Sequence, residues 1–361
     1  MKKKSAPNNG FQLVFYTTAR LLMELDTLDH QILTLLTQDG RVPNVHIGAA
    51  LGVSQSTIKK RIDRLIDGGA CRVLAIVDPE VLGFRTSVVL LIRSRPGSSG
   101  GVVGSLEALP EICWATQTIG RYGVFAEAIL RGSDEIFDLV ARRIGGMPGV
   151  DGVETLVVTR QISWRPIERR VSTASRASGR ADRYEAPAWH GDAGAYPGVA
   201  FTGDDPRPSE RIDDIDVRII ALLQEDGRRP AADIARMVRL SQPTVKSRID
   251  RLVGRGVCKI AAVIDPAVLG LPTGALVHIG VDTGSIVETG DTLARVPAIT
   301  WLCHTTGRFD LLAEIHMADT REVVEFAGRT IAEIPGVRTA EVSLFAEQSG
   351  GHPFAWRPQS N

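Results

Sequence analysis

Net charge, cysteine and long apolar runs are all scarce in this chain of 361 residues. Its 42 basic residues balance 42 acidic ones, so any interaction with nucleic acid must come from local patches. The four cysteines stand far apart with no Cys-x-x-Cys pair, which does not fit a zinc site and favours a reducing compartment. No run of about 18 uncharged apolar residues exists, so we expect no membrane contact. We also expect a cytoplasmic protein and, from the cysteine spacing, no metal site.

A long segment of the chain occurs twice. The stretch VSQSTIKKRIDRLIDGGACR at 53–72 returns as LSQPTVKSRIDRLVGRGVCK at 240–259. Asp29 matches Asp216, an offset of 216 − 29 = 187, and this offset holds without a gap from about 28 to 160. A repeat of this length indicates a duplicated module and not a solenoid. Cys71 and Cys258, the next-to-last residues of the two stretches, are expected to be buried as small apolar residues.

The first part of each module, about 26–70 in the first copy, predicts three helices. Ile32, Leu35 and Leu36 form an i, i+3, i+4 stripe on the first helix. Pro43 suits the start of the second helix, as does Pro230 in the second copy. Serine is expected to cap the third helix in both copies.

The third helix is the most informative. Ile58, Ile62 and Leu65 form an apolar back, and a polar face rich in Ser, Thr, Lys and Arg points the other way. A helix of this kind after a short helix and a tight turn is typical of a helix-turn-helix, which reads bases in the major groove and contacts phosphates. The predicted DNA-binding residues are Ser54, Gln55, Ser56, Thr57, Lys59, Lys60, Arg61 and Arg64, then Ser241, Gln242, Thr244, Lys246, Ser247, Arg248 and Arg251. The alternative is an exposed basic face on a small helical bundle.

The second part of each module, about 86–162 in the first copy, has the period of strands. Its order reads as βαββαβ, a ferredoxin-like arrangement, with Ser133 expected to cap the second helix. Such a sheet leaves one face to be covered, and here a second copy in the same chain can cover it. The predicted fold class is α+β, with two copies of a three-helix, winged-type helix-turn-helix domain followed by a βαββαβ domain.

The sequence resembles the Lrp/AsnC (feast/famine) transcription regulators. The resemblance is carried by DGR after the first helix, by LGVSQSTIKKRIDRLIDGG and VDPEVLGF, and by GRYG and GRFD in the sheet domains. It implies a helix-turn-helix joined by a strand hinge to a ligand-sensing RAM domain, dimerisation through the sheets, and self-association into larger assemblies. It also implies two kinds of partner: double-stranded DNA at a promoter, and a small effector such as an amino acid. Because most members carry one unit per chain, the simplest consequence of two units is a built-in pseudo-dimer. The alternative is that the modules pair between chains, as a homodimer or a larger assembly.

The resemblance and the repeat together divide the chain into seven segments. They are an N-terminal tail (1–25), helix-turn-helix domain 1 (26–85), RAM-like domain 1 (86–165), a linker (166–208), helix-turn-helix domain 2 (209–271), RAM-like domain 2 (272–348) and a C-terminal tail (349–361). As a flexible coil the linker would reach roughly 35 Å, enough for the modules to lie side by side.

The two copies differ where the family places its effector, in a Gly-x-x-Asp turn. The second copy keeps Asp310, whereas the first has Gly123, so we expect the second to retain an effector site. A carboxylate can accept hydrogen bonds from a ligand ammonium and glycine cannot. The predicted effector residues are His304, Thr305, Thr306, Gly307, Arg308 and Asp310, with Gly120 and Arg121 in the first copy. The alternative is that both turns are structural and that the Asp caps a strand end.

The third helices differ as well, which predicts an asymmetric DNA site. Ser56 and Lys60 of the first copy correspond to Pro243 and Ser247 of the second. Because protein symmetry is mirrored in the DNA, unequal helices should prefer unequal half-sites.

Two other functions compete with the regulator. Siroheme decarboxylases of haem biosynthesis resemble this family and can be fused pairs with a vestigial helix-turn-helix. A pure oligomerising scaffold would explain the sheets but not two basic helices. We expect a regulator, with no catalytic residues and no cofactor.

Overall fold

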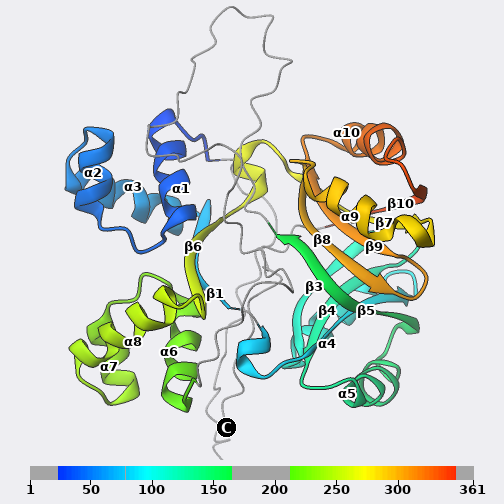
Figure 1. Ribbon diagram of the computed structural model, residues 1–361, viewed down its shortest axis with the longest axis horizontal. Helices are drawn as coiled ribbons and strands as arrows, with labels where there is room; N and C mark the ends of the chain where they lie inside the picture. Colours follow the sequence, from blue (N-terminus) through cyan, green and yellow to red (C-terminus); the bar gives the residue numbers. More distant parts are fainter. Residues whose placement is uncertain (1–22, 78, 165–211, 347–361) are drawn as a thin grey trace, which may run out of the picture.

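The computed structural model describes residues 23–77, 79–164 and 212–346. Two small helical domains stand on one side of the molecule and a closed sheet with flanking helices on the other (Figure 1). Within these residues no helix is long and apolar enough to cross a membrane. The predicted linker (166–208) and C-terminal tail (349–361) lie outside the described residues, as does most of the predicted N-terminal tail (1–25).

Each helical domain contains the three predicted helices followed by one strand. The elements are α1 (Thr27–Gln38), α2 (Asn44–Leu51), α3 (Gln55–Asp67) and β1 (Cys71–Val77), then α6 (Asp214–Glu225), α7 (Ala231–Val238), α8 (Gln242–Gly254) and β6 (Cys258–Ile264). Pro43 and Pro230 stand at the N-cap positions of α2 and α7, so the predicted helix starts are confirmed.

The βαββαβ order of both RAM-like domains is also confirmed. After the 3₁₀ turn η1 (Pro79–Leu82), the first copy has β2 (Thr86–Ser94), α4 (Ser99–Glu107), β3 (Ile112–Ile119), β4 (Val124–Leu130), α5 (Asp134–Phe137), η2 (Asp138–Ile144) and β5 (Val150–Trp164). After η4 (Pro266–Leu269), the second has β7 (Thr273–Val281), η5 (Thr283–Ser285), α9 (Ile286–Ala294), β8 (Ile299–Thr306), β9 (Leu311–Met317), α10 (Thr320–Glu325), η6 (Phe326–Ile331) and β10 (Val337–Phe345). In both copies the second helix ends in π-helical turns, η2 and η6.

The predicted start of this helix at Ser133 is confirmed, but the capping hydrogen bond is not made. Ser133 occupies the N-cap position of α5, but its side chain makes no capping hydrogen bond. The backbone of Ser133 is already in the right-handed helical region (φ −67°, ψ −21°), whereas a capping side chain normally needs an extended backbone.

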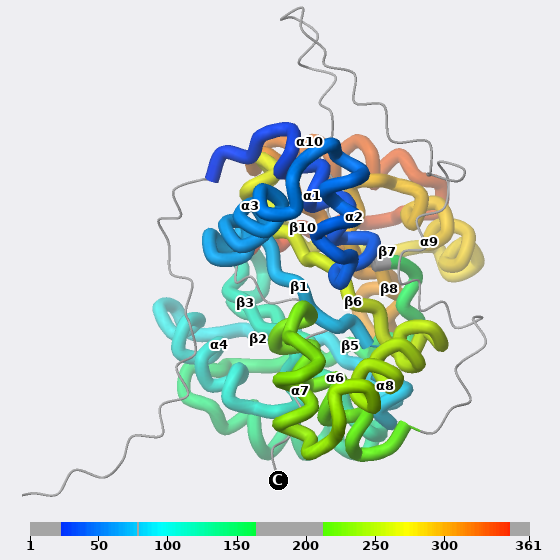
Figure 2. The backbone as a smooth tube through the Cα atoms, turned by 90° about the vertical axis from the view of Figure 1, so that its left-hand side faces the viewer, coloured from blue at the N-terminus to red at the C-terminus, as the bar shows by residue number. Residues whose placement is uncertain are grey.

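The strands β1 and β6 join the two copies within one chain. They pair antiparallel, and Leu74 stands opposite Ala261, its own equivalent at the offset of 187. A pseudo-twofold axis therefore passes through this pair of residues. The ribbon lies between the two helical domains in both views (Figures 1 and 2), so the chain forms the predicted pseudo-dimer by itself.

The two four-stranded sheets close on each other in the order β10-β3-β4-β2-β5-β8-β9-β7. The two seams between the sheets keep the same register, since Val157 pairs with Thr306 and its equivalent Leu344 pairs with Ile119. Among the described residues the seams differ in length. From the Val157–Thr306 pair, the β5–β8 ladder continues as far as the pair of Trp164 with Trp301. After the Leu344–Ile119 pair, the β10–β3 ladder has one more pair and then ends.

The β1–β6 ribbon connects two hydrophobic cores because its side chains alternate between faces. Val73 and Ala75 pack among the helices of both helical domains, whereas Leu74 and Ile76 pack with the residues inside the closed sheet. The helical domains therefore share one core, and the ribbon ties it to the RAM-like domains.

Candidate DNA and effector sites

The third helices α3 and α8 lie on opposite sides of the β1–β6 ribbon (Figure 2). Each begins with the predicted cap: Ser54 accepts a hydrogen bond from the Thr57 N–H at 3.2 Å, and Ser241 accepts one from the Thr244 N–H at 3.3 Å. The apolar residues of each helix face the core, which leaves one polar face of each helix outward.

The outward face carries most of the predicted DNA-binding residues. In α3 the side chains of Gln55, Ser56, Lys59 and Lys60 are exposed, and Lys59 forms a 2.5 Å ion pair with Asp63 one turn later. In α8 the exposed residues are Gln242, Thr244, Lys246 and Ser247. Their contact with DNA remains a prediction.

Four of the predicted DNA-binding arginines hold the helices together. Asp29 of α1 is fully buried and is bonded by both Arg61 and Arg64 of α3, with Arg61 Nη1 at 3.0 Å from Oδ1. The second copy repeats this contact: Arg248 and Arg251 lie 2.7 and 2.6 Å from the buried Asp216.

The same contact extends to the helix caps. Arg61 also bonds Asp26, the N-cap of α1, and this hydrogen bond lowers the pKa of the Asp26 carboxyl. This helix clamp was not predicted from the sequence. Its signal was available, because the two acids and the two arginines of the first copy all recur at the offset of 187, as Asp213, Asp216, Arg248 and Arg251.

A second pair of arginines locks the two helical domains to each other. Arg41 donates to the carbonyl oxygen of Gly227 at 2.8 Å, and Arg228 donates to that of Gly40 at 2.7 Å. Burial lowers the pKa of both guanidinium groups. Gly40 must be glycine, since a Cβ would lie 2.5 Å from Val73 Cγ1. The repeated Asp-Gly-Arg is therefore one of the contacts between the halves.

In the second copy, the predicted effector turn is tied down by its own acid. Asp310 Oδ2 accepts the Val281 N–H at 2.7 Å and lies 3.7 Å from Arg338 Nη2. Thr305 Oγ1 donates to the Phe309 carbonyl oxygen at 2.7 Å. The carboxylate is still 28% exposed, so it has a structural partner and a side open to solvent.

In the first copy, two serines occupy the space that an acid would need. Ser94 and Ser99 lie within hydrogen-bond distance of each other at 2.7 Å. A Cβ at Gly123 would lie 2.2 Å from Ser94 Oγ and 2.9 Å from Ser99 Oγ. The first copy therefore lacks the carboxylate and also packs its turn differently.

Both turns lie where one sheet meets the other. A Cβ at Gly307 (φ +119°) would come within 2.8 Å of Leu156 on β5, and one at Gly120 (φ +156°) within 3.2 Å of Ser343 on β10. The ring of His304 instead lies against α9, where a Cβ on Gly290 would be 3.1 Å from it. The structure therefore brings the predicted turn residues to the seams but directs His304 to the helix layer. Its pKa is lowered by burial.

Several polar groups inside the closed sheet were not predicted. Glu127 of β4 is 5% exposed, accepts a hydrogen bond from Ser87 at 3.2 Å, and has its pKa raised to about 8, mainly by burial. Its equivalent Glu314 contacts His316 at 2.7 Å. His278 contacts Ser343 at 3.0 Å, and burial lowers its pKa to about 4.

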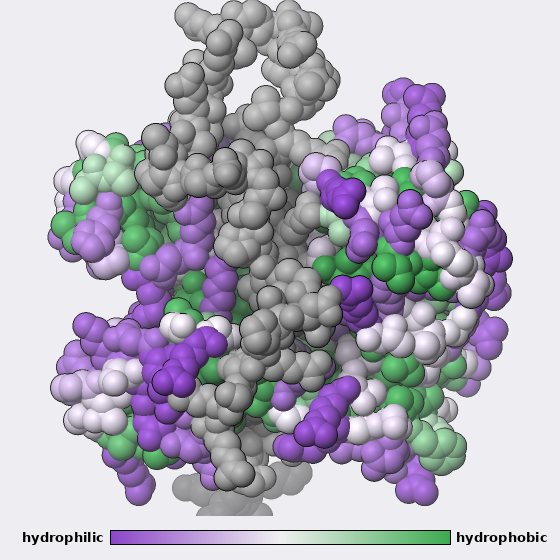
Figure 3. Space-filling view, viewed as in Figure 1, coloured by the Kyte–Doolittle hydropathy of each residue, from purple (hydrophilic) through white to green (hydrophobic). Residues whose placement is uncertain are grey.

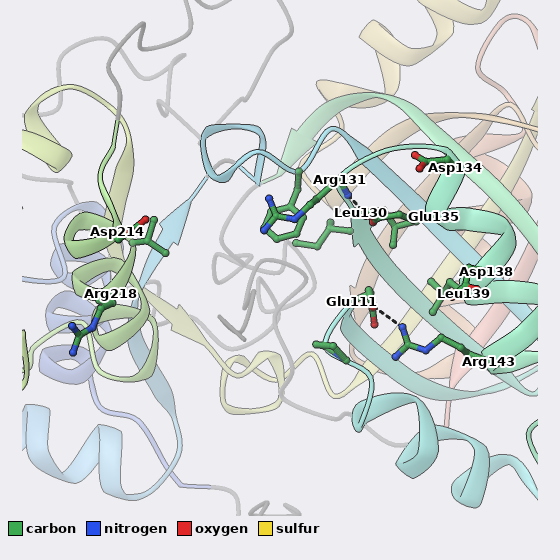
Figure 4. A pocket seen from close by; sticks show the side chains of 14 residues that line it. Glu111, Leu130, Arg131, Asp134, Glu135, Asp138, Leu139, Arg143, Asp214 and Arg218 are labelled. Atoms are coloured by element: carbon green, nitrogen blue, oxygen red, sulfur yellow. Dashed lines mark hydrogen bonds and ion pairs between the residues drawn. The ribbon is translucent and has the colours of Figure 1, made fainter. Parts of the chain in front are cut away.

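A cleft of about 810 Å³ opens between RAM-like domain 1 and helix α6 (Figure 4). Its lining includes an ion pair of Glu111 with Arg143 at 2.5 Å, with Asp214 and Arg218 on the α6 side. None of the predicted DNA or effector residues lines this cleft.

Comparison with known protein families agrees with this architecture. The AsnC-type helix-turn-helix domain matches residues 25–66 and 212–253, and the Lrp/AsnC ligand binding domain matches residues 79–166 and 274–349. These matches cover more than half of the chain. The chain belongs to the Lrp/AsnC family of transcriptional regulators and carries two complete units of it.

Individual relatives match one unit at a time. The transcriptional regulator FL11 of Pyrococcus horikoshii is 32% identical over 137 residues, which are 38% of this chain and 90% of FL11. The regulatory protein AsnC of Haemophilus influenzae is 27% identical over 37% of this chain and 90% of its own length.

Solved structures of the siroheme decarboxylase NirDL match both units together. The siroheme decarboxylase NirDL covers 89% of this chain, and 91% of NirDL is covered, with a TM-score of 0.58 and 16% sequence identity. At this identity the likeness shows the fold alone.

Proposed function

We propose that this chain is a sequence-specific, double-stranded-DNA-binding transcription regulator of the cytoplasm. The observation that carries the proposal is the pair of third helices, each capped, each exposing a polar face, and related by the pseudo-twofold axis of the β1–β6 ribbon. A twofold pair of helix-turn-helix domains is the arrangement that reads two half-sites in successive major grooves.

The preferred DNA site is asymmetric. Lys60 can donate to guanine in one half-site, whereas the equivalent Ser247 offers only a short hydroxyl. Lys59 and Lys246 would contact phosphates, which carry no sequence information. Equal affinity for a perfect palindrome and for the best asymmetric site would contradict this part of the proposal.

Fluorescence anisotropy with double-stranded DNA from upstream of the chain's own gene tests the proposal, at several salt concentrations and against scrambled competitor DNA. The matched variant is Lys59→Ala/Lys246→Ala, which leaves the arginine clamps intact. We expect binding that weakens with salt and a less steep salt dependence in the variant, by about 0.9 per lost phosphate contact. If selection from random sequences also yields no bound DNA, the proposal fails.

We also propose that an amino acid or related metabolite binds at the Gly307–Asp310 turn. The partly open Asp310 carboxylate at a seam between the sheets supports this, since it can accept from a ligand ammonium. Asp310→Asn is the sharp variant because an amide oxygen can still accept the Val281 N–H while the negative charge is lost. In calorimetric titrations with amino acids, unchanged affinity in this variant would contradict the site. Association of further copies through the RAM-like domains, by family likeness, can be measured by sedimentation.

A siroheme-decarboxylase-like enzyme is the second candidate. It is favoured by the whole-chain fold match to NirDL, which has also been solved with an iron-uroporphyrin III analogue. The second RAM-like domain buries three histidines, His278, His304 and His316, but His278 bonds Ser343 and His316 bonds Glu314. An absorbance titration with an iron tetrapyrrole distinguishes the two functions, since a regulator should give no saturable spectral change.

A further inference from the structure

Helix-turn-helix domain 2 contains an arginine where the backbone favours glycine. Arg239 ends α7 with φ +59° and ψ +45°, in the left-handed region, and its N–H donates to the Ala235 carbonyl oxygen. It is the single non-glycine residue with positive φ in the part of the chain that the structure describes. A side chain there is unfavourable because its Cβ crowds the following carbonyl oxygen.

The first copy shows what this turn requires. Gly52 is the equivalent residue, with φ +67° and ψ +28°, and its N–H donates to the Gly48 carbonyl oxygen in the same way. A Cβ at Gly52 would meet no atom within 4 Å. The turn therefore has room for a side chain but gains nothing in backbone energy from one, so the arginine at this position has no local structural reason.

Arg239 also has no partner among the described residues. Helix-turn-helix domain 2 has nine basic and six acidic residues over 214–257, against five and four over 27–70 in domain 1. Other arginines of this excess are held: Arg218 donates to the Met237 carbonyl oxygen, Arg229 pairs with Glu225, and Arg236 pairs with Asp233. Arg239 is exposed, and no hydrogen bond or ion pair in the described residues engages its guanidinium.

The position places this free cation beside the proposed DNA face. Arg239 lies two residues before Ser241, the N-cap of α8, so it stands just before the start of the helix whose first residues approach the base edges. On the face shown in Figure 3, the domain at lower left, which contains α8, presents mostly hydrophilic side chains, whereas the domain containing α3 shows a larger apolar share.

We propose that Arg239 is a DNA-backbone contact that only the second helix-turn-helix domain can make, through its guanidinium and a phosphate. This inference rests on the proposed DNA-binding function. Its consequence is a division of labour: domain 2 anchors the chain on any duplex, and the Lys60-bearing domain 1 contributes more of the sequence preference.

The test compares two reciprocal variants, Arg239→Gly and Gly52→Arg, with Arg321→Ala as a control. Arg321 is 84% exposed on α10, so its removal changes the net charge equally but far from the DNA face. The probe is a random-sequence duplex of about 30 base pairs, long enough for two half-sites a helical turn apart. Anisotropy gives affinity and its salt dependence, and urea unfolding gives stability.

Arg239→Gly should shift the two readouts in opposite directions. We expect a higher urea midpoint, because glycine suits the turn, together with a roughly two- to fivefold loss of affinity, as for one exposed charge pair. The log–log salt slope should become less steep by about 0.9. Gly52→Arg should give the reverse: lower stability and a slope steeper by about 0.9.

Three outcomes overturn the inference, and they are distinguishable. Unchanged affinity and slope in Arg239→Gly would show that the arginine does not contact DNA, whatever its effect on stability. An equal loss in Arg321→Ala would reduce the effect to net charge. A wild-type chain that binds neither this duplex at low salt nor any selected sequence would remove the proposed function itself, and this inference with it.

Discussion

The two helix-turn-helix domains share their buried contacts and differ on their surfaces. Asp29 and its equivalent Asp216 each hold two arginines of the third helix, and Gly40 and Gly227 each accept an arginine from the other half. In contrast, Lys60 is replaced by Ser247 in the exposed row. Divergence after duplication has therefore spared what holds the pseudo-dimer together and changed what faces outward.

The RAM-like domains differ inside as well as outside. His278 and Ser343 form a buried polar pair in the second copy, where the first has Leu91 and Leu156. The turns differ in the same sense, with the Asp310 carboxylate in one copy and a serine pair beside Gly123 in the other. The carboxylate at the turn is present in the second copy and not in the first, which is why we propose the effector site in the second copy.

The largest effect should come from the helix clamp. Asp29→Ala and Asp216→Ala should each destabilise the chain by about 3 kcal/mol, since each removes a buried charge partner and one half of a capping box. Urea unfolding measures this, with the exposed Asp67→Ala as a control expected within about 0.5 kcal/mol of wild type. A large difference between the two halves would break the claim that their buried contacts are equivalent.

The next effect is a pH dependence inside the closed sheet. Burial raises the pKa of Glu127 to about 8 from its ordinary 4.5, so the folded chain holds a proton that the unfolded chain releases. Stability from this group is complete below about pH 4.5 and is lost as the pH rises through 8. Glu127→Gln should remove this loss when unfolding is measured from about pH 5 to pH 9.

The equivalent acid on the other copy refines that measurement. The Glu314 carboxylate contributes to the raised pKa of Glu127 by charge repulsion. Glu314→Gln should therefore move the Glu127-dependent loss of stability to lower pH without abolishing it. If Glu314→Gln leaves the pH profile unchanged, the two glutamates are not coupled across the sheet. If Glu127→Gln leaves it unchanged, Glu127 is not the group that titrates.

A smaller effect concerns sequence preference. Exchanging one exposed residue between the third helices, Lys60→Ser with Ser247→Lys, should transfer the preference of one half-site to the other, by about 1 kcal/mol per base pair. Selection from random DNA before and after the exchange measures this. A preference that stays with its original half would mean that other residues of the helix read the bases.

Much of the fold could be predicted because the repeat tests each pattern twice. The apolar stripe of Ile58, Ile62 and Leu65 fixed the orientation of α3, and the strand periods gave the βαββαβ order. The role of Arg64 was harder, because periodicity places it outward while its long side chain reaches back to Asp29. Tertiary partners of long charged side chains cannot be read from a helical pattern, and neither can a buried acid such as Glu127 on an otherwise apolar strand.

The antiparallel pairing of Leu74 with Ala261 has a consequence for mass action. In a regulator built from separate subunits, the fraction assembled falls as the protein is diluted. Here both halves of the ribbon belong to one covalent chain, so their association is unimolecular and independent of the number of copies per cell. The two helix-turn-helix domains therefore stay paired at any dilution, and one chain always pairs two unlike domains.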